Sequence, residues 1–561
     1  MIHMGFRRSL FILLNVAVLF VLVGYVVFPS LYSVWESLGG NAGFSVDAYL
    51  DIFSSDSYFS AILNTILLSA ATVVGAGFFG GLLSYIFWRF DFPYKNLLHK
   101  IFLLPLGLPP LVGVFSFLFL YSESGILPRL IQNLFSLDSP PFSFDGFGAV
   151  LIVHVYSFFV HFFLFSLAGL SKFDYSMIEA AQTLGTTKLR TLTRVMLPML
   201  RPSVVSASLM VFILSTASFT APLLFASRER YLTVEIFNQK LNGNFEIASA
   251  LTVVLIFISI AVLYLFEKQQ GEKLLTFARR GASAKVAPKP ITPLFAGILS
   301  LQFLFVILPI LTLLLMSFSA SDASKLAVIP DKYSLENYLS IFQEENFYRP
   351  FVNSLEMAIL AGVPNLIFGF IAGALVVQKE TVAKPLMSVL LLLPLAIPAT
   401  ALAINLIATF NKPSPLALGN VLVASSAILP LAYFIRNIPY VSRSVSSTLA
   451  TFDYSLIEAG LNLGASFIKV IGRIVLPIIL SSIASGFLFT FINAIGEFPC
   501  SVLLYNAENK PVSVEIFSEL RLNEFGVASA QGVLLMLLIF AFTWIFGLVF
   551  KTRNKLSSFD F

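Results

Sequence analysis

The sequence is poor in charged side chains and almost lacks cysteine. Only 12% of its 561 residues are charged, whereas an ordinary soluble domain carries about 25%. The lone cysteine, Cys500, excludes an intramolecular disulfide and any multi-cysteine metal site. Hydrophobic residues make up 57% of the chain, with 59 phenylalanines. No soluble core uses that much apolar surface, so we expect a lipid bilayer to surround most of the chain.

Motifs of catalysis are also missing. No G-x-x-x-x-G-K-[ST] phosphate-binding loop occurs in the sequence, which excludes ATP hydrolysis by that mechanism. No set of His, Cys or carboxylate residues has catalytic spacing, which argues against a membrane-embedded enzyme. His154 and His161 lie seven residues apart, on one face of a helix. They are either metal ligands or interhelical hydrogen-bond partners, and the second interpretation is favoured.

Long apolar stretches dominate what is present. About twelve are long enough, or nearly so, to cross roughly 30 Å of hydrocarbon as helices. They lie near residues 10–33, 60–88, 101–121, 148–170, 203–226, 248–266, 292–316, 352–378, 385–410, 419–437, 478–504 and 528–550. We interpret the first as a retained helix rather than a cleaved signal peptide. The sequence therefore predicts an all-α membrane protein.

The charges of the connecting segments predict an orientation. If the N-terminus is cytoplasmic, the cytoplasmic segments hold 25 Lys/Arg and 9 Asp/Glu, and the external segments hold 10 and 19. This asymmetry follows the positive-inside rule, and twelve spans place both termini in the cytoplasm. Two acidic residues, Glu356 and Glu497, fall inside apolar stretches. Charges at membrane depth are costly and often functional. Glu497 is therefore a candidate for the translocation path, with a buried structural carboxylate as the alternative.

The chain contains an internal repeat. FDYSMIEAAQTLG at 173–185 recurs as FDYSLIEAGLNLG at 452–464, VEIF at 234–237 recurs at 514–517, and LLPLGLP at 103–109 recurs as LLPLAIP at 392–398. We expect a first unit over 1–266, a polar, basic linker over 267–290, and a second unit over 291–561. Each unit holds six spans, so the two have parallel orientation.

The strongest motif is a loop that occurs once in each half. In both copies a Glu and two small residues are followed, at identical spacing, by a Gly and then by Leu-Pro. Small residues allow another surface to approach, Gly supplies a turn, and Pro interrupts the chain before the next span. The residues concerned are Glu179, Ala180, Ala181, Gly185, Leu197 and Pro198 in the first copy, and Glu458, Ala459, Gly460, Gly464, Leu476 and Pro477 in the second.

These loops resemble the EAA loop of permeases from binding-protein-dependent ABC importers. The resemblance covers nearly the whole chain, as two fused permease units of the type I importer fold. It implies that each loop forms a coupling helix that docks on a cytoplasmic ATPase subunit. It also implies two ATPase copies that use ATP and Mg, an extracytoplasmic solute-binding protein, and the bacterial cytoplasmic (inner) membrane. We expect no metal site, no cofactor bound by this chain itself and no nucleic-acid partner. Gly460 departs from the family pattern, which usually has Ala there.

The substrate is less constrained by the sequence. The segment GEFPCSVLLYNAENKPVSVEIF, at 496–517, resembles ferric-iron permeases most and thiamine permeases next. Polyamine, sulfate, molybdate and phosphonate permeases share the loop and stay as alternatives. A further alternative is an ion-coupled secondary transporter, which would need an intramembrane relay of charges.

Overall fold

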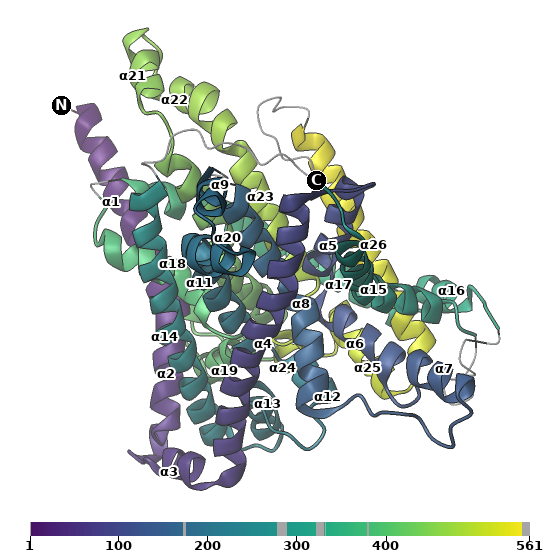
Figure 1. Cartoon of the computed structure of the whole chain (residues 1–561). Coiled ribbons are helices and arrows are strands. Elements are labelled where there is room, and N and C mark those ends of the chain that lie inside the picture. The colour runs from purple at the N-terminus through teal and green to yellow at the C-terminus, as the bar shows by residue number, and fades with distance from the viewer. Residues whose placement is uncertain are drawn as a thin grey trace. The chain divides into compact units, whose positions relative to one another are not determined.

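The computed structural model describes residues 2–171, 176–277, 289–320, 330, 332–378 and 381–551, and these residues are largely helical (Figure 1). Ten helices in them are long and apolar enough to cross a membrane. An eleventh crossing is possible if the bent pair Lys384–Ala396 and Ala399–Phe410 counts as one span. The protein is therefore an all-α membrane protein, as the sequence predicted, with ten or eleven such spans in place of the expected twelve.

Fourteen α-helices are found in the described residues of the first half. Their bounds are α1 Ile2–Leu22, α2 Phe28–Ser37, α3 Asp47–Ser54, α4 Asp56–Arg89, α5 Lys95–Gly107, α6 Pro110–Tyr121, α7 Ile126–Leu134, α8 Gly146–Ser171, α9 Ser176–Thr183, α10 Lys188–Thr191, α11 Leu197–Thr216, α12 Thr220–Phe225, α13 Leu232–Leu241 and α14 Phe245–Phe277. π-Helical segments η1 Val23–Val27 and η3 Leu192–Met196 join α1 to α2 and α10 to α11, and a 3-10 turn η2 covers Gly40–Ala42. The short strands β1 Phe90–Asp91 and β2 Lys289–Pro290 pair in parallel.

The second half follows the same order. Its helices are α15 Pro293–Ser317, α16 Glu336–Gln343, α17 Glu345–Val377, α18 Lys384–Ala396, α19 Ala399–Phe410, α20 Ile428–Ala450, α21 Ser455–Asn462, α22 Phe467–Val470, α23 Leu476–Ile495, α24 Ser501–Leu504, α25 Val512–Arg521 and α26 Phe525–Lys551. A 3-10 turn η5 covers Pro415–Ala417 and a π-helical segment η6 covers Ile471–Val475.

The helix at the tenth expected span begins nine residues and ends thirteen residues later than predicted. The apolar pattern favoured 419–437, but α20 begins at Ile428 and ends at Ala450. Residues 419–427 form turns, with positive φ at Gly419 and Ala424. The second half of α20 carries Ser, Thr and Arg residues, so its hydropathy is low, and α20 is not among the ten spans chosen by composition.

Two compact units make up the chain, and they do not follow the order of the sequence. Unit 1 comprises Met1–Tyr49, Gln239–Val253 and Tyr338–Phe561, and unit 2 comprises Leu50–Asn238 and Val254–Asn337. The first helices of the two halves are thereby exchanged: α2 packs against α19 in unit 1, and α15 packs against α6 in unit 2. Tyr25 fixes this exchange in unit 1, because its hydroxyl donates to the Leu416 carbonyl oxygen at 2.7 Å.

Each unit is built on three mutually packed helices. These are α4, α8 and α11 in unit 2, and α17, α20 and α23 in unit 1. Glycines at repeat-equivalent positions permit the closest approach. A Cβ on Gly80 would lie 2.4 Å from the Phe159 carbonyl oxygen, and a Cβ on Gly369 would lie 2.6 Å from the Val441 Cβ. Helices in a membrane gain their packing from such small residues.

The repeat extends to individual hydrogen bonds near one end of α4 and α17. Asn64 Nδ2 donates to the Arg230 carbonyl at 3.2 Å, and Asn353 Nδ2 donates to the Lys510 carbonyl at 3.0 Å. Beside them, Thr65 accepts from the Leu232 backbone N–H, and Ser354 accepts from the equivalent N–H of Val512. These bonds fix the start of α13 and of α25 against the long helix of each unit.

Candidate functional site

The first of the two loops forms a helical hairpin between α8 and α11. Residues 172–175 lie outside the described residues, and α9 begins at Ser176. Gly185 has φ +77° and ends α9, with its N–H donating to Gln182 and the N–H of Thr186 donating to Ala181. This is the left-handed helix end that glycine favours. Leu197 and Pro198 then open α11, where a proline has no N–H to leave unpaired.

The second loop has the same geometry. Gly464 has φ +82° and ends α21, its N–H donates to Leu461, and the N–H of Ala465 donates to Gly460. Leu476 and Pro477 open α23 after the π-helical segment. The two copies of the repeated loop, one in each unit, thus take the same backbone path.

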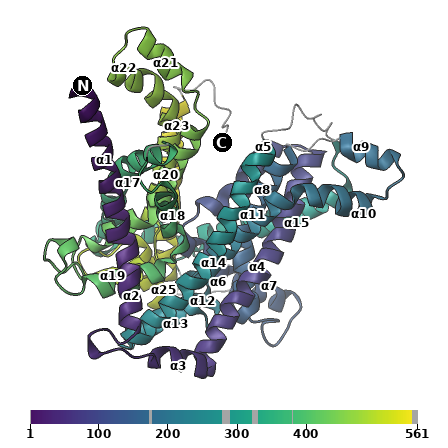
Figure 2. The ribbon, with the colours of Figure 1, turned by 90° about the vertical axis from the view of Figure 1, so that its left-hand side faces the viewer.

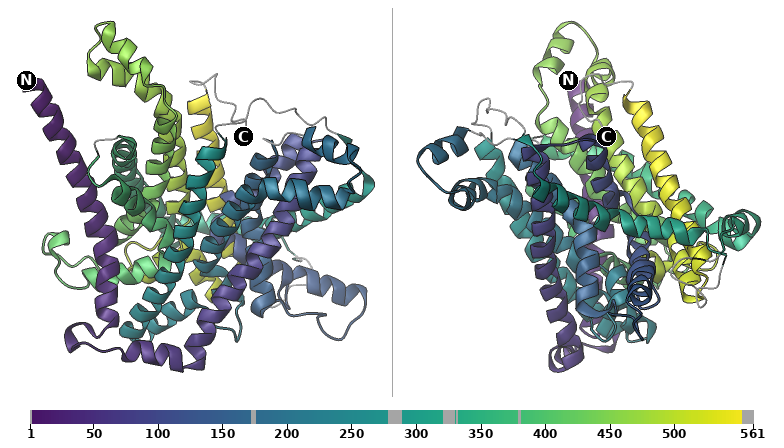
Figure 3. Two further views of the ribbon diagram at one scale, coloured as in Figure 1. Left: turned by 60° about the vertical axis from the view of Figure 1, so that its left-hand side comes forward. Right: turned by 45° about the vertical axis from the view of Figure 1, so that its right-hand side comes forward.

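Both hairpins expose most of the residues that the sequence selected, but Ala181 and Gly460 are buried within their hairpins. Glu179 and Ala180 are exposed in the first loop, as are Glu458 and Ala459 in the second. Apolar side chains accompany them: Leu184 is 84% exposed and Leu463 is 89% exposed. Figure 2 and Figure 3 show α21 and α22 projecting beyond the end of α23. In unit 1, the start of α1 and the end of α26 lie at that same end (Figure 1). An exposed apolar surface held outside the helix bundle is suited to contact with another protein.

Gly460 fits its loop closely. A Cβ on Gly460 would lie 3.0 Å from Val470 Cγ2 and 3.1 Å from Ile474 Cδ1. In the first loop the equivalent residues are Ala181, Thr191 and Val195. The methylene that Gly460 lacks relative to Ala181 is replaced by the extra methylene of Ile474. The departure from the family pattern is thus a local exchange of volume.

The other candidate, Glu497, lies at the break between α23 and α24. Its side chain is 3% exposed. Its carboxylate accepts from Arg436 Nη1 at 2.7 Å, from the backbone N–H groups of Cys500 and Ser501 at 2.9 Å each, and from the Ser501 hydroxyl at 2.5 Å. The carboxylate is therefore fully engaged, and it caps the first turn of α24. By contrast, Glu356 is exposed on α17.

Sequence reasoning missed Arg436. It lies in α20, and its side chain is 34% exposed. It falls inside the predicted tenth span at 419–437, yet only the acidic residues Glu356 and Glu497 were singled out as charges within apolar stretches. The signal that could have found it is the repeat: α8 at 146–171, shifted by the 279 residues that separate the two loops, predicts a helix over 425–450.

In the first half the matching break, between α11 and α12, is uncharged. Ser218 occupies the place of Glu497, and its hydroxyl lies 2.9 Å from His154 Nε2. His154 Nδ1 lies 3.0 Å from the Ser215 hydroxyl and 3.3 Å from that of Thr72. Both ring nitrogens of His154 thus have hydroxyl partners within its unit, as the interhelical interpretation predicted, whereas the buried Nδ1 of His161 has no hydrogen-bond partner within the described residues. The carbonyl oxygen at the break accepts from Thr233 in the first half and from Ser513 in the second.

Helices α13 and α25 lie outside the candidate spans and carry buried carboxylates. Arg230 pairs with Glu235 at 3.4 Å, and Lys510 pairs with Glu515 at the equivalent place. Burial, together with the neighbouring Glu515, raises the pKa of Glu519 to about 7. The first half has Gln239 at that position, which is a neutral side chain of the same shape.

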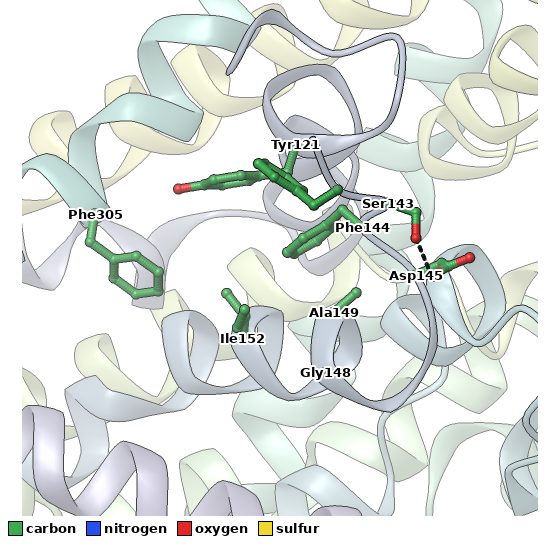
Figure 4. A pocket seen from close by; sticks show the side chains of 9 residues that line it. Tyr121, Ser143, Phe144, Asp145, Gly148, Ala149, Ile152 and Phe305 are labelled. Carbon is green, nitrogen blue, oxygen red and sulfur yellow. Dashed lines mark hydrogen bonds between the residues drawn. The ribbon is translucent and has the colours of Figure 1, made fainter. Parts of the chain in front are cut away.

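A cavity of about 490 Å³ lies in unit 2 between α6, α8 and α15 (Figure 4). Aromatic rings line it, among them Tyr121, Phe144 and Phe305, and Ser143 donates to Asp145 at its rim. No group of three or more His, Cys, Asp and Glu side chains that could hold a metal ion is found within the described ranges.

Comparison with known families gives two matches along the chain. The profile of the family described as "Binding-protein-dependent transport system inner membrane component" matches residues 74–269 and 365–555. These two ranges each contain one of the loops and together cover more than half of the sequence.

Similar proteins are permeases. A probable ABC transporter permease, y4fN of Sinorhizobium fredii, is 27% identical over 482 residues, covering 84% of this chain and 83% of its own length. The ferric transport system permease FbpB of Actinobacillus pleuropneumoniae is 23% identical over 537 residues, covering 93% and 76%. A putative 2-aminoethylphosphonate permease, PhnU of Salmonella typhi, is 23% identical over 231 residues, covering 41% and 80%. Among solved structures, a bacterial ABC transporter for alginate import is similar with a TM-score of 0.38 and 20% identity, covering 47% of this chain and 96% of that one.

Proposed function

Since the chain belongs to the family of binding-protein-dependent transport system inner membrane components, we propose that it forms the complete translocation path of an ABC importer, driven through its two cytoplasmic loops. The chain is a multi-pass inner-membrane transport subunit with two fused permease units.

The observation that carries the proposal is the matched geometry of the two loops. Each has a short helix, a glycine in the left-handed region and a second helix that leads through a π-helical segment into a span. Their exposed Glu and Ala residues form a rigid projection that a partner's groove can hold. We assign Glu179, Ala180, Ala181 and Gly185, with Glu458, Ala459, Gly460 and Gly464, to ATPase docking.

Two ATPase subunits follow from two loops, one for each. They bind and hydrolyse ATP with Mg, and this chain is the transport subunit. Closing and opening of the ATPase pair moves the loops and shifts the permease between inward-facing and outward-facing states. The loops, with both chain termini, lie in the cytoplasm according to the charge distribution of the connecting segments. An extracytoplasmic binding protein delivers the solute to the opposite side.

Ferric iron is the substrate we propose. The ferric permease FbpB aligns with 93% of this chain, whereas the phosphonate permease aligns with 41% of it. In this arrangement the binding protein selects the metal, and the permease passes it on. A phosphonate or another oxyanion is the second candidate, favoured by the similarity to PhnU.

The test is reconstitution. The chain is purified with its partner ATPase and binding protein, placed in liposomes, and supplied with ATP. Uptake of radioactive ferric iron should require both partners and should not be matched by sulfate, thiamine or 2-aminoethylphosphonate. Uptake that proceeds without the ATPase, driven by an ion gradient, would contradict the proposal and favour a secondary transporter.

A further inference from the structure

Arg436 stands deep within its helix. It is the ninth residue of α20, about 12 Å from the first residue and about 21 Å from the last at 1.5 Å per residue. A guanidinium is always charged, and placing it against hydrocarbon is costly. It therefore needs either complete pairing or access to water.

Hydrogen bonds satisfy only part of the Arg436 guanidinium. Nη1 donates to Glu497 at 2.7 Å, and within the described residues the other guanidinium nitrogens have no partner. One third of the side chain is exposed, whereas the side chain of Glu497 is 3% exposed. The pair therefore presents N–H donors outward and hides its carboxylate.

The carboxylate oxygens of Glu497 are already occupied by hydrogen bonds, so they are not available to bind a passing solute. Two backbone N–H groups, the Ser501 hydroxyl and Arg436 occupy its oxygens. Ser501 is fixed in turn by the Tyr433 hydroxyl at 2.7 Å. This network holds the Arg436 head in one place, at the break where α23 ends.

We propose that Arg436 is a solute-contacting residue of the translocation path, which binds anionic oxygen atoms of the passing solute, and that Glu497 is its positioning residue. This rests on the proposed transport function. A guanidinium binds carboxylates and oxyanions through parallel N–H bonds, and it repels a bare cation. Ferric iron would consequently cross as a complex with anionic oxygen ligands. The first half has Ser157 at the equivalent position, so the contact is one-sided.

Accessibility is the first test. In a Cys500→Ala background, Arg436→Cys should react with a membrane-impermeant thiosulfonate at least tenfold faster than Leu360→Cys. Leu360 is the matched control because it is a 60% exposed apolar residue in the middle of α17. Equal, slow reaction at both positions would place Arg436 against lipid and overturn the proposal.

Transport is the second test, in the same liposomes with ferric citrate presented by the binding protein. Arg436→Gln should lower uptake at least tenfold, and Arg436→Lys should retain more. The double variant Arg436→Gln/Glu497→Gln removes both charges together, so a purely structural ion pair should be relieved by it. We expect uptake to stay low in the double variant; recovery to the parental rate would show a structural pair and overturn the proposal.

Two measurements distinguish a failure of the proposed transport function from a failure of the role of Arg436. Co-purification of the ATPase with each variant reports on the transport assembly and should not change. If the parental chain fails to retain the ATPase, the proposed function is wrong, whereas a retained ATPase with parental uptake in Arg436→Gln rejects the role of Arg436 alone.

Discussion

The two loops have the same backbone geometry but differ in the side chains that pack inside them. In the first loop the Thr186 and Thr191 hydroxyls lie 2.9 Å apart, and Ala181 fills the space beside them. In the second, Ala465 and Val470 replace the hydroxyl pair, and Gly460 lies against Val470 and Ile474. The same fold is thus reached with polar contacts in one copy and apolar packing in the other.

This exchange predicts a coupled pair of substitutions. Gly460→Ala adds a methyl group where Val470 and Ile474 stand 3.0 and 3.1 Å away. Overpacking costs about 1–3 kcal/mol, which offsets the gain of about 0.5–1 kcal/mol for replacing a helical Gly by Ala. Adding Ile474→Val removes the clashing methylene. Amide hydrogen exchange over 455–463 should be faster in Gly460→Ala than in the double variant.

The control for that pair is Ile474→Val alone, which should leave a small void and also exchange faster than the parent. A Gly460→Ala variant as protected as the double variant would show that the loop has room and that the volume argument is wrong.

Sequence alone could predict the loops at this scale but not the network at Glu497. The Glu, the small residues and the Gly recur at fixed spacing, so their turn could be inferred. The partners of Glu497 lie in three helices: Arg436 in α20, Ser501 in α24, and Ser513 in α25, which donates to the Glu497 carbonyl oxygen. The contact with Ser501 is local in sequence, but Arg436 reaches Glu497 only because α20 packs against α23 and α24.

At the scale of elements, α25 carries a buried carboxyl pair that α13 lacks. Glu515 raises the pKa of Glu519, Lys510 lowers it, and exposed Glu524 raises it. Helix α24 has no charged residue, and α26 has none before Lys551. Helix α17 carries Glu345, Tyr348, Arg349 and Glu356, none of which contributes to the shift. Gln239 in α13 resembles the protonated form of Glu519.

The pair predicts a pH dependence of stability. The folded-state pKa of Glu519, about 7, lies above the ordinary value of 4.5 for a glutamate side chain. The folded chain therefore binds the extra proton between these values, so stability falls as pH rises through that window and levels off above it. Glu519→Gln should remove this pH dependence of stability. The midpoint of thermal unfolding of the variant, relative to the parent, should rise from pH 5 to pH 7.5 and then stay constant.

Glu508→Gln is the matched control, since Glu508 is exposed and does not act on Glu519. Its difference from the parent should be flat across the same pH range. A flat difference for Glu519→Gln as well would mean that this carboxyl is ionised in the folded state.

The bounds of α20 are predicted poorly by hydropathy and well by the internal repeat. The apolar pattern placed a span at 419–437, although α20 covers Ile428–Ala450. Helix α20 packs against α17, α18 and α23, and its Ser, Thr and Arg residues lower its own hydropathy. Because such a helix owes its place to its neighbours, its position was readable from α8 and the repeat, not from its own composition.

At the scale of the whole molecule, the first helix of each half packs in the unit formed mainly by the other half. Helix α1 contacts α17 and α18, α2 contacts α19, and α15 contacts α4, α5 and α6. The sequence predicted two consecutive units, 1–266 and 291–561, with a linker over 267–290. Residues 278–288 of that linker lie outside the described residues. The exchange of helices could not be predicted, because apolar periodicity does not say which partner a helix packs against.

The exchange predicts that the chain can be cut without falling apart. Fragments 1–281 and 282–561, produced together, should co-purify, because each contributes a helix to the other's unit. Tyr25→Ala should weaken this recovery about tenfold, since it removes the bond to Leu416 and the ring contact with Phe410. Phe20→Ala, at a 58% exposed position on the same helix, is the control and should have no effect. Loss of pairing in the unsubstituted fragments would show that the covalent linker holds the halves together.

The central claim is that the two hairpins connect this permease to its ATPase. Ala180→Arg and Ala459→Arg each place a long charged side chain on an exposed docking face, outside the candidate spans. Each variant should insert normally. The direct measurement is the amount of ATPase retained by the purified chain, in the parent, in each single variant and in the double variant. We expect partial retention in the single variants and at least a tenfold loss in the double variant. Parental retention in the double variant would contradict the account.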